Sequence, residues 1–210
     1  MDIADASPKK IVTILVSGFE PFGGSSLNPS QLLVEELSRE DIPGAELFSI
    51  VLPVEFARAA EILLSKVAEV KPDLVLAFGQ AEGRASITPE KIAINFDDAR
   101  IPDNAGNQRH QQIIDPAGAD GYFSTLPVET MVDAMNKNGV PSAISLSAGT
   151  FVCNHIFYSM QRALLDTPIK SGFIHLPLVL EQTNEFPSQP TLELALMVRA
   201  IRAAINKIIT

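Results

Sequence analysis

The sequence predicts an α/β fold: a three-layer α/β/α sandwich around a mostly parallel, twisted mixed sheet. Short apolar runs rich in β-branched residues, typical of strands covered on both faces, alternate with longer segments whose apolar residues recur at helical spacing. The 210 residues are 46% hydrophobic, so the folded chain can bury about 70% of its unfolded surface. No repeat, low-complexity tract or linker interrupts it, so we expect a single domain over residues 1–210 with a flexible polar leader at 1–10.

The first half of the chain alternates strand and helix. We predict strands at residues 11–17, 45–52 and 73–78 and helices at 28–39 and 54–70. Asn28 can cap the first helix, and Pro29 is pre-set for its first position. The second helix should stop before Pro72, because the residue preceding a proline avoids helical geometry.

The second half is less regular. We predict strands at residues 91–96, 142–146 and 172–176, and helices at 128–137, from Cys153 or Asn154 to 165, and at 191–209. The segment 97–122 is dense in Asp, Pro, Gly, Asn and Gln and has little periodicity. A long structureless segment inside a compact domain is more often functional than idle, so it is a candidate lid or oligomer contact.

Charge and cysteine content limit the class of protein. The formal net charge of -9 repels phosphate backbones and anionic lipid head groups, which argues against nucleic-acid and membrane-surface partners. Cys153 is the one cysteine, so no internal disulfide can form, and a reducing, cytoplasmic location is expected. The apolar run after Lys9 and Lys10 is too short for a signal peptide, and no stretch is long enough for a membrane span.

Cys153 has two interpretations. A lone cysteine is commonly an inert core residue. However, Cys153 follows small residues and Gly149 at the start of a predicted helix, where first-turn amides and the helix dipole would stabilise a thiolate nucleophile. If the strands 142–146 and 172–176 are parallel neighbours, His175 projects from the same sheet edge and is the favoured base. His155 lies two residues along the helix and should point elsewhere, and His110 lies in the polar loop.

Other features leave alternatives open. An acid that orients the histidine has four candidates: Glu82, Glu90, Asp97 and Asp98. The glycine-rich loop at residues 18–24 could cradle an anion, but its spacing matches no phosphate-binding motif and two phenylalanines occupy it. No His, Cys, Asp and Glu set has metal-ligand spacing, so no metal is expected.

Seven ordered motifs resemble one known family, the pyroglutamyl peptidases, which are also called pyrrolidone-carboxylate peptidases. The motifs are GFEPFGG with NPS (18–30), LPV (52–54), GQAEGR (79–84), ITPEKIAIN (87–95), DARIPDNAG (98–106), SLSAGTFVCN (145–154) and GFIHLP (172–177). The resemblance implies a cytosolic cysteine peptidase that removes N-terminal pyroglutamyl residues from peptides through an acyl-enzyme. It implies a single catalytic domain that forms homodimers or homotetramers and needs no metal or cofactor.

The resemblance also assigns residues. It makes Cys153 the nucleophile, His175 the base and Glu90 the acid that orients the histidine. The substrate-binding residues that it implies are Phe19, Phe22 and Phe151 around the ring, and Asn28 and Gln80 as polar contacts. Arg100 becomes an oxyanion candidate.

Glu82 departs from the family pattern, in which this position commonly holds a small residue. The acidic side chain puts the loop shape and the substrate preference of the family in doubt for this chain. Two alternative functions are a non-catalytic lactam-binding relative and a phosphate-dependent enzyme on a similar sandwich.

Overall fold

The central sheet has five strands in the order β2-β1-β3-β7-β4 in the computed structural model, which describes residues 10–210. The strands β1 (Val12–Phe19), β2 (Ala45–Leu52), β3 (Leu74–Gln80) and β7 (Lys170–Leu176) are parallel, and the short β4 (Thr88–Pro89) pairs antiparallel with β7. The predicted mostly parallel, mixed sheet is therefore confirmed.

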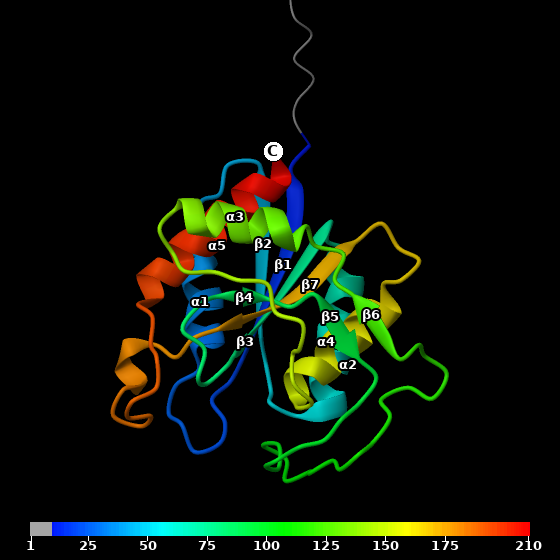
Figure 1. The fold of residues 1–210 in the computed structure, drawn as a ribbon. Coiled ribbons are helices and arrows are strands. Elements are labelled where there is room, and N and C mark those ends of the chain that lie inside the picture. Colours follow the sequence, from blue (N-terminus) through cyan, green and yellow to red (C-terminus); the bar gives the residue numbers. More distant parts are fainter. Residues whose placement is uncertain (1–9) are drawn as a thin grey trace, which may run out of the picture.

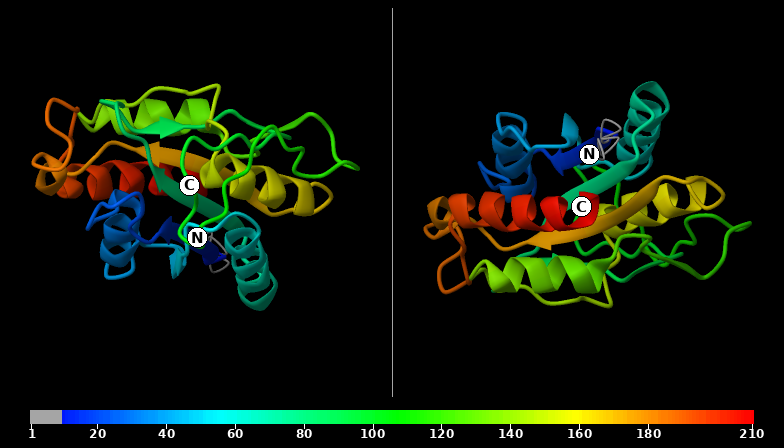
Figure 2. Two further views of the ribbon diagram at one scale, coloured as in Figure 1. Left: turned by 90° about the horizontal axis from the view of Figure 1, so that it is seen from below. Right: turned by 90° about the horizontal axis from the view of Figure 1, so that it is seen from above.

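Five α-helices cover the two faces of this sheet. Helices α1 (Pro29–Leu37), α3 (Val128–Lys137) and α5 (Leu194–Ile209) pack on one face. Helices α2 (Phe56–Val70) and α4 (Val152–Ala163) pack on the other, so that the strands run between two helical layers (Figures 1 and 2). This arrangement is the predicted three-layer α/β/α sandwich.

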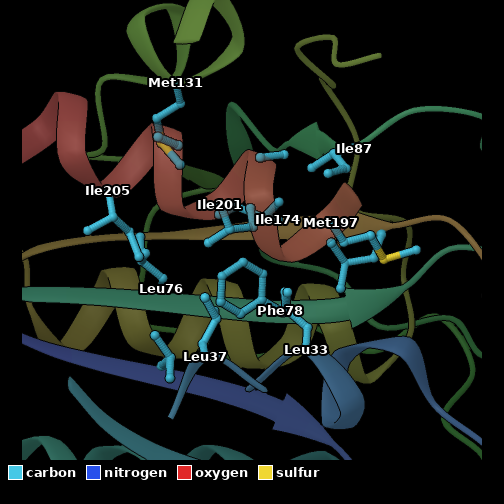
Figure 3. Packing of buried hydrophobic residues seen from close by; sticks show 14 of the residues in the cluster. Leu33, Leu37, Leu76, Phe78, Ile87, Met131, Ile174, Met197, Ile201 and Ile205 are labelled. Atoms are coloured by element: carbon cyan, nitrogen blue, oxygen red, sulfur yellow. The ribbon is translucent and has the colours of Figure 1, made fainter. Parts of the chain in front are cut away.

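The alternation of side chains along each strand divides the core into two halves. On β3, Leu76 and Phe78 point toward α1, α3 and α5, whereas Val75 and Ala77 point toward α2 and α4. Figure 3 shows Phe78 beneath residues of α5, with Leu33 and Leu37 of α1 beside it. Both faces of the sheet are buried, which is why its strands read as continuous apolar runs.

Side-chain caps explain where two of the predicted helices begin. The Asn28 side chain accepts a hydrogen bond from the Ser30 amide at 3.0 Å, as an N-cap residue should. Helix α2 begins at Phe56, two residues later than predicted, and the Phe56 amide donates to Asp103 Oδ2 at 3.1 Å. A carboxylate from the distant loop thus caps this helix, which no local pattern could indicate.

The predicted strand at residues 142–146 is wrong. This segment forms only isolated parallel bridges, from Ser142 to Ile87 and from Ser145 to Glu90. The segment therefore lies along the side of β4 that faces away from β7. It is not the neighbour of β7 that the sequence suggested. Its last two apolar residues, Ile144 and Leu146, are exposed, so it has no second face to bury as a sheet strand would.

The region around the long polar segment also differs from the prediction. The strand expected at 91–96 is reduced to β5 (Ile92–Ile94), which pairs with the unpredicted β6 (Gly121–Phe123) in a separate two-stranded sheet. A 3₁₀ helix, η1 (Leu180–Gln182), was also not predicted. Most of the expected leader lies outside the described residues. Among residues 10–210, no helix has the length and apolar character that crossing a membrane requires.

Candidate active site

The candidate catalytic residues meet at the carboxyl ends of β3 and β7. His175 lies on β7, opposite Gly79 of β3 and Thr88 of β4. Glu90 directly follows β4, and Cys153 lies in the first turn of α4. Cys153 and His175 line one pocket. Three separate segments of the chain, which are α4, β7 and the residues after β4, thus supply the three side chains.

Glu90 and His175 form a buried pair. The Nδ1 atom of His175 lies 2.7 Å from Oε1 of Glu90, and both residues are almost fully buried. Burial would raise the pKa of Glu90, but the hydrogen bond from His175, with help from Ser145 and Arg84, holds it below the ordinary value. An ionised carboxylate only accepts hydrogen bonds, so Nδ1 carries the proton and Nε2 is the ring nitrogen left for chemistry.

Arg84 completes this cluster, although the sequence analysis gave it no role. Its Nη1 donates to Oε1 of Glu90 at 2.6 Å and to the Thr88 hydroxyl, and its Nη2 donates to the Ser147 carbonyl oxygen at 3.0 Å. One guanidinium therefore ties the acid to the segment that leads into Cys153. The GQAEGR motif contains Arg84, but nothing local indicates that its side chain turns toward Glu90.

The surroundings of Cys153 oppose the stabilised thiolate that the helix start favours. Burial, reinforced by the negative charge of Glu90, raises the pKa of Cys153 to about 12. Arg84 and the Cys153 amide lower it by less. Burial also lowers the pKa of His175, and Arg84 adds to this effect, while the hydrogen bond to Glu90 opposes it. Both shifts favour a neutral thiol and a neutral imidazole in the resting pair.

Two neighbours hold Cys153 in place. A Cβ atom on Gly79 would lie 2.9 Å from Cys153 Sγ, so the thiol packs directly on the β3 backbone. Asn154 is fully buried and joins α4 to β5, accepting from the Ile94 amide and donating to the carbonyl oxygens of Ile94 and Phe96. The turn before the helix includes Gly149 with φ of 75°, a conformation that suits glycine.

The other two histidines and Asp97 do not belong to this cluster. His155 is buried against Asp97, with its Nδ1 2.8 Å from Asp97 Oδ2, and Arg109 donates to the same oxygen at 2.8 Å. Asp97 is therefore not the partner of His175. His110 is exposed, with Asp98 3.6 Å away.

A small, largely apolar recess opens beside the thiol. Cys153, Val54 and Val152 line it together with all five residues that the family resemblance assigned to the substrate: Phe19, Phe22, Asn28, Gln80 and Phe151. The ring centroids of Phe22 and Phe151 are 6.1 Å apart. The Asn28 amide already donates to the Glu20 carbonyl oxygen and accepts from Ser30, so Asn28 shapes the recess chiefly by holding its loop.

The wider pocket outside the recess has a charged rim. Glu82, Asp98 and Arg100 line it, and Glu82 and Arg100 are exposed. The first residues of the long polar segment therefore form part of this pocket. Arg100 shares this pocket with Cys153.

The loop at residues 18–24 offers little to an anion. The Phe19 amide donates to the Ser30 hydroxyl and the Glu20 amide to the Leu52 carbonyl oxygen, while Asn28 already caps the following helix. Within residues 10–210, no cluster of three or more His, Cys, Asp or Glu residues is arranged to hold a metal ion.

Comparison with known proteins places this arrangement in context. A family described as "Pyroglutamyl peptidase" matches residues 12–210. A pyrrolidone-carboxylate peptidase of a Thermoanaerobacter species is 46% identical over 197 residues, which cover 93% of this chain and 97% of that protein. One from Vibrio vulnificus is 47% identical over 188 residues, 90% of this chain and 88% of that protein.

Solved structures agree with this result. Pyroglutamyl peptidase I from Bacillus amyloliquefaciens superposes with a TM-score of 0.90 at 38% identity and covers 95% of this chain and 96% of that one. Pyrrolidone carboxyl peptidase from Thermococcus litoralis gives a TM-score of 0.89 at 36% identity and covers 94% of this chain and 93% of that one.

Proposed function

This chain belongs to the pyroglutamyl peptidase family, and on that premise we propose that it removes N-terminal pyroglutamyl residues with Cys153 as nucleophile, His175 as base and Glu90 as the orienting acid. The observation that carries the assignment is the buried pair of Glu90 Oε1 and His175 Nδ1, 2.7 Å apart, in a histidine that shares its pocket with the single cysteine.

Because the Cys153 thiol and the His175 imidazole are both neutral at rest, His175 can act as a general base. As Cys153 Sγ attacks the pyroglutamyl carbonyl carbon, Nε2 of His175 takes the thiol proton, and Glu90 stabilises the imidazolium that forms. Backbone amides in the first turn of α4 are suited to stabilise the oxyanion, with Arg100 as a second candidate.

Two bond cleavages complete the cycle. The C–N bond breaks, His175 protonates the leaving amine, and a thioester remains. Water then attacks the thioester and gives its proton to His175, releasing pyroglutamate and restoring the thiol.

The residues that line the recess match the chemistry of the ring of this substrate. Pyroglutamate carries a flat lactam without an ammonium group, and Phe19, Phe22 and Phe151 offer apolar faces of matching kind. Gln80 supplies an amide for the polar edge of the ring. Proline lacks the ring carbonyl and would leave this amide unpaired, which predicts strong rejection of prolyl substrates.

The direct test is fluorophore release from a pyroglutamyl amide, with the prolyl amide as substrate control and Cys153→Ser as enzyme control. We expect release from the pyroglutamyl amide alone, and a loss of at least 1,000-fold in the variant, about the effect of removing a nucleophile. If the reduced protein binds a pyroglutamyl ligand but does not release fluorophore, the alternative of a non-catalytic lactam-binding relative replaces the proposal.

The location and assembly of the protein are also proposals. The unpaired Cys153 favours a reducing, cytoplasmic compartment. Phe123 and Leu146 are exposed apolar side chains, which suits a face that a second copy of the chain covers in a homodimer or homotetramer. Light scattering on the purified protein tests this assembly, and a monomer at micromolar concentration would contradict it.

A further inference from the structure

Gln182 is an unusual residue in the segment after β7. It is fully buried, whereas every other residue from Leu180 to Gln189 is exposed or half-buried. A buried amide costs free energy unless its donors and acceptor are paired, and Gln182 meets that condition through four contacts. Its Oε1 accepts from the Val179 amide at 3.1 Å, and its Nε2 lies 3.2 Å from the Leu27 carbonyl oxygen. Its Nε2 also lies 3.2 Å from Ser25 Oγ and 3.0 Å from Gln80 Oε1.

Two of these contacts determine which way the Gln182 amide faces. The Val179 amide can only donate, so the atom next to it must be the oxygen of Gln182. The Leu27 carbonyl can only accept, so the atom next to it must be the nitrogen. The backbone thus fixes the orientation of this side chain from both sides.

The orientation passes on to Gln80. Because Nε2 of Gln182 can only donate, the Gln80 atom that lies 3.0 Å from it must be an acceptor, which is the carbonyl oxygen Oε1. The NH₂ group of Gln80 is then left over, and within residues 10–210 no protein acceptor pairs with it. Gln80 lines the recess beside Cys153, so this NH₂ group is available to donate a hydrogen bond to an occupant of the recess.

We propose that Gln182 is a positioning residue for substrate specificity, which holds the Gln80 amide so that it donates to the ring carbonyl of the pyroglutamyl group. This inference rests on the proposed function, because it takes that group as the occupant of the recess. It assigns to a residue of the distal segment, on η1, the selection of a lactam with an acceptor oxygen. If the Gln80 amide were reversed, its own oxygen would face the ring carbonyl and repel it.

The chain offers a matched control in Glu185. This residue fastens the same segment to the same loop, because its carboxylate accepts from the Ser25 and Ser26 hydroxyls, but it makes no contact with Gln80. Glu185→Gln loosens the segment without disturbing the Gln80 amide. It therefore separates an effect on orientation from an effect on the fold of the segment.

The experiment compares two rates in the wild type, Gln182→Met and Glu185→Gln. The first is kcat/KM for a pyroglutamyl amide, which needs the ring contact. The second is the rate at which iodoacetamide alkylates Cys153, which needs the thiol and its surroundings but no lactam.

We expect Gln182→Met to lower kcat/KM by about 10- to 100-fold, the cost of an unpaired buried polar group, with the alkylation rate within twofold of the wild type. Glu185→Gln should keep both rates within threefold. In a Gln80→Met background the Gln182 substitution should add nothing, because it acts through Gln80.

Three results overturn the proposal: kcat/KM within threefold of wild type in Gln182→Met, equal losses in Gln182→Met and Glu185→Gln, or full additivity with Gln80→Met. If Gln182→Met does not fold, Gln182→Glu, which keeps the acceptor for Val179, is judged by the same criteria. A wild-type protein inactive on the pyroglutamyl amide would instead refute the proposed function, so the two failures are distinguishable.

Discussion

Two opposing effects act on the pKa of the Cys153 thiol. Its place in the first turn of α4 favours a thiolate, yet burial and the nearby Glu90 charge raise its pKa to about 12. Desolvation dominates because the thiol lies against the backbone of Gly79, in a region packed between two layers. In the proposed mechanism this thiol reacts slowly with oxidants and alkylating agents until the proposed base, His175, removes its proton.

Alkylation kinetics test this state of the thiol. The rate with iodoacetamide should rise about tenfold per pH unit from pH 7 to 10 without a plateau, because only the thiolate reacts and its pKa lies higher. Glu90→Gln removes the charge that raises the pKa of Cys153, so it should alkylate faster at pH 8 while losing at least 100-fold in peptidase activity.

The rim residue Glu82 supplies the control for this substitution. Glu82→Gln, which removes a negative charge at the same pocket, should leave both rates within a few-fold of wild type. A plateau in the alkylation rate below pH 8 would show that the thiolate already forms near neutrality and would contradict the protonated thiol.

At the scale of elements, the site depends on how closely α4 approaches β3. The helix can place Cys153 over the strand because position 79 has no side chain, and the ring of Phe173 from β7 fills the space next to it. Asn154 fixes the position of α4 relative to β5 through its three hydrogen bonds to the segment around that strand. Catalytic geometry therefore comes from packing between elements and not from the helix alone.

The substitution Gly79→Ala tests this packing. The new Cβ would lie 2.8 Å from Phe173 Cζ and 2.9 Å from Cys153 Sγ, so either the ring or the thiol must move. We expect a loss of about 1–3 kcal/mol in the free energy of unfolding and of at least 100-fold in kcat/KM.

A second substitution separates these two effects. Adding Phe173→Leu should recover stability in urea denaturation, because it removes the ring contact, but not activity, because the contact with the thiol remains. Recovery of full activity in the double variant would show that the thiol position does not depend on Gly79.

At the scale of the whole molecule, the buried acid–histidine pair links stability to pH. The folded protein lowers the pKa of His175 below its ordinary value of 6.5 and that of Glu90 below 4.5. Well above pH 6.5 neither group binds a proton in the folded or the unfolded state. As the pH falls below 6.5, the unfolded chain protonates the histidine first, which favours unfolding. Below 4.5 Glu90 adds to the loss.

Urea denaturation at pH 7.5, 6.5 and 5.5 measures this dependence. The free energy of unfolding should be highest at pH 7.5 and fall between 6.5 and 5.5, and His175→Gln should reduce that fall. The acid limb of kcat/KM should lie below pH 6.5 if His175 is the base as proposed, since its pKa is lowered. An equal fall in the His175→Gln variant would assign the effect to other groups.

The sequence by itself determined the parts that local chemistry controls. Buried strands such as β1 and β3 are apolar throughout, α1 has its Asn28 cap and Pro29 start, and helical spacing marks α2. These features depend on residues within one turn or one strand, so the alternation of strands and helices, and with it the α/β fold class, could be predicted. The family was also predictable, because its ordered motifs are short, local and numerous.

Only the tertiary structure decided which side chains meet. The acids Glu90 and Asp97 looked alike in the sequence, but β4 brings one to His175 and the long loop brings the other to His155. The same is true of the contact between Arg84 and Ser147 and of that between Gln182 and Gln80, which join segments far apart in the chain. The predicted strand at 142–146 failed for this reason too, since pairing depends on a free neighbour in the sheet. Contacts between distant segments leave no period or spacing in the sequence, and the pKa of the Cys153 thiol depends chiefly on such contacts.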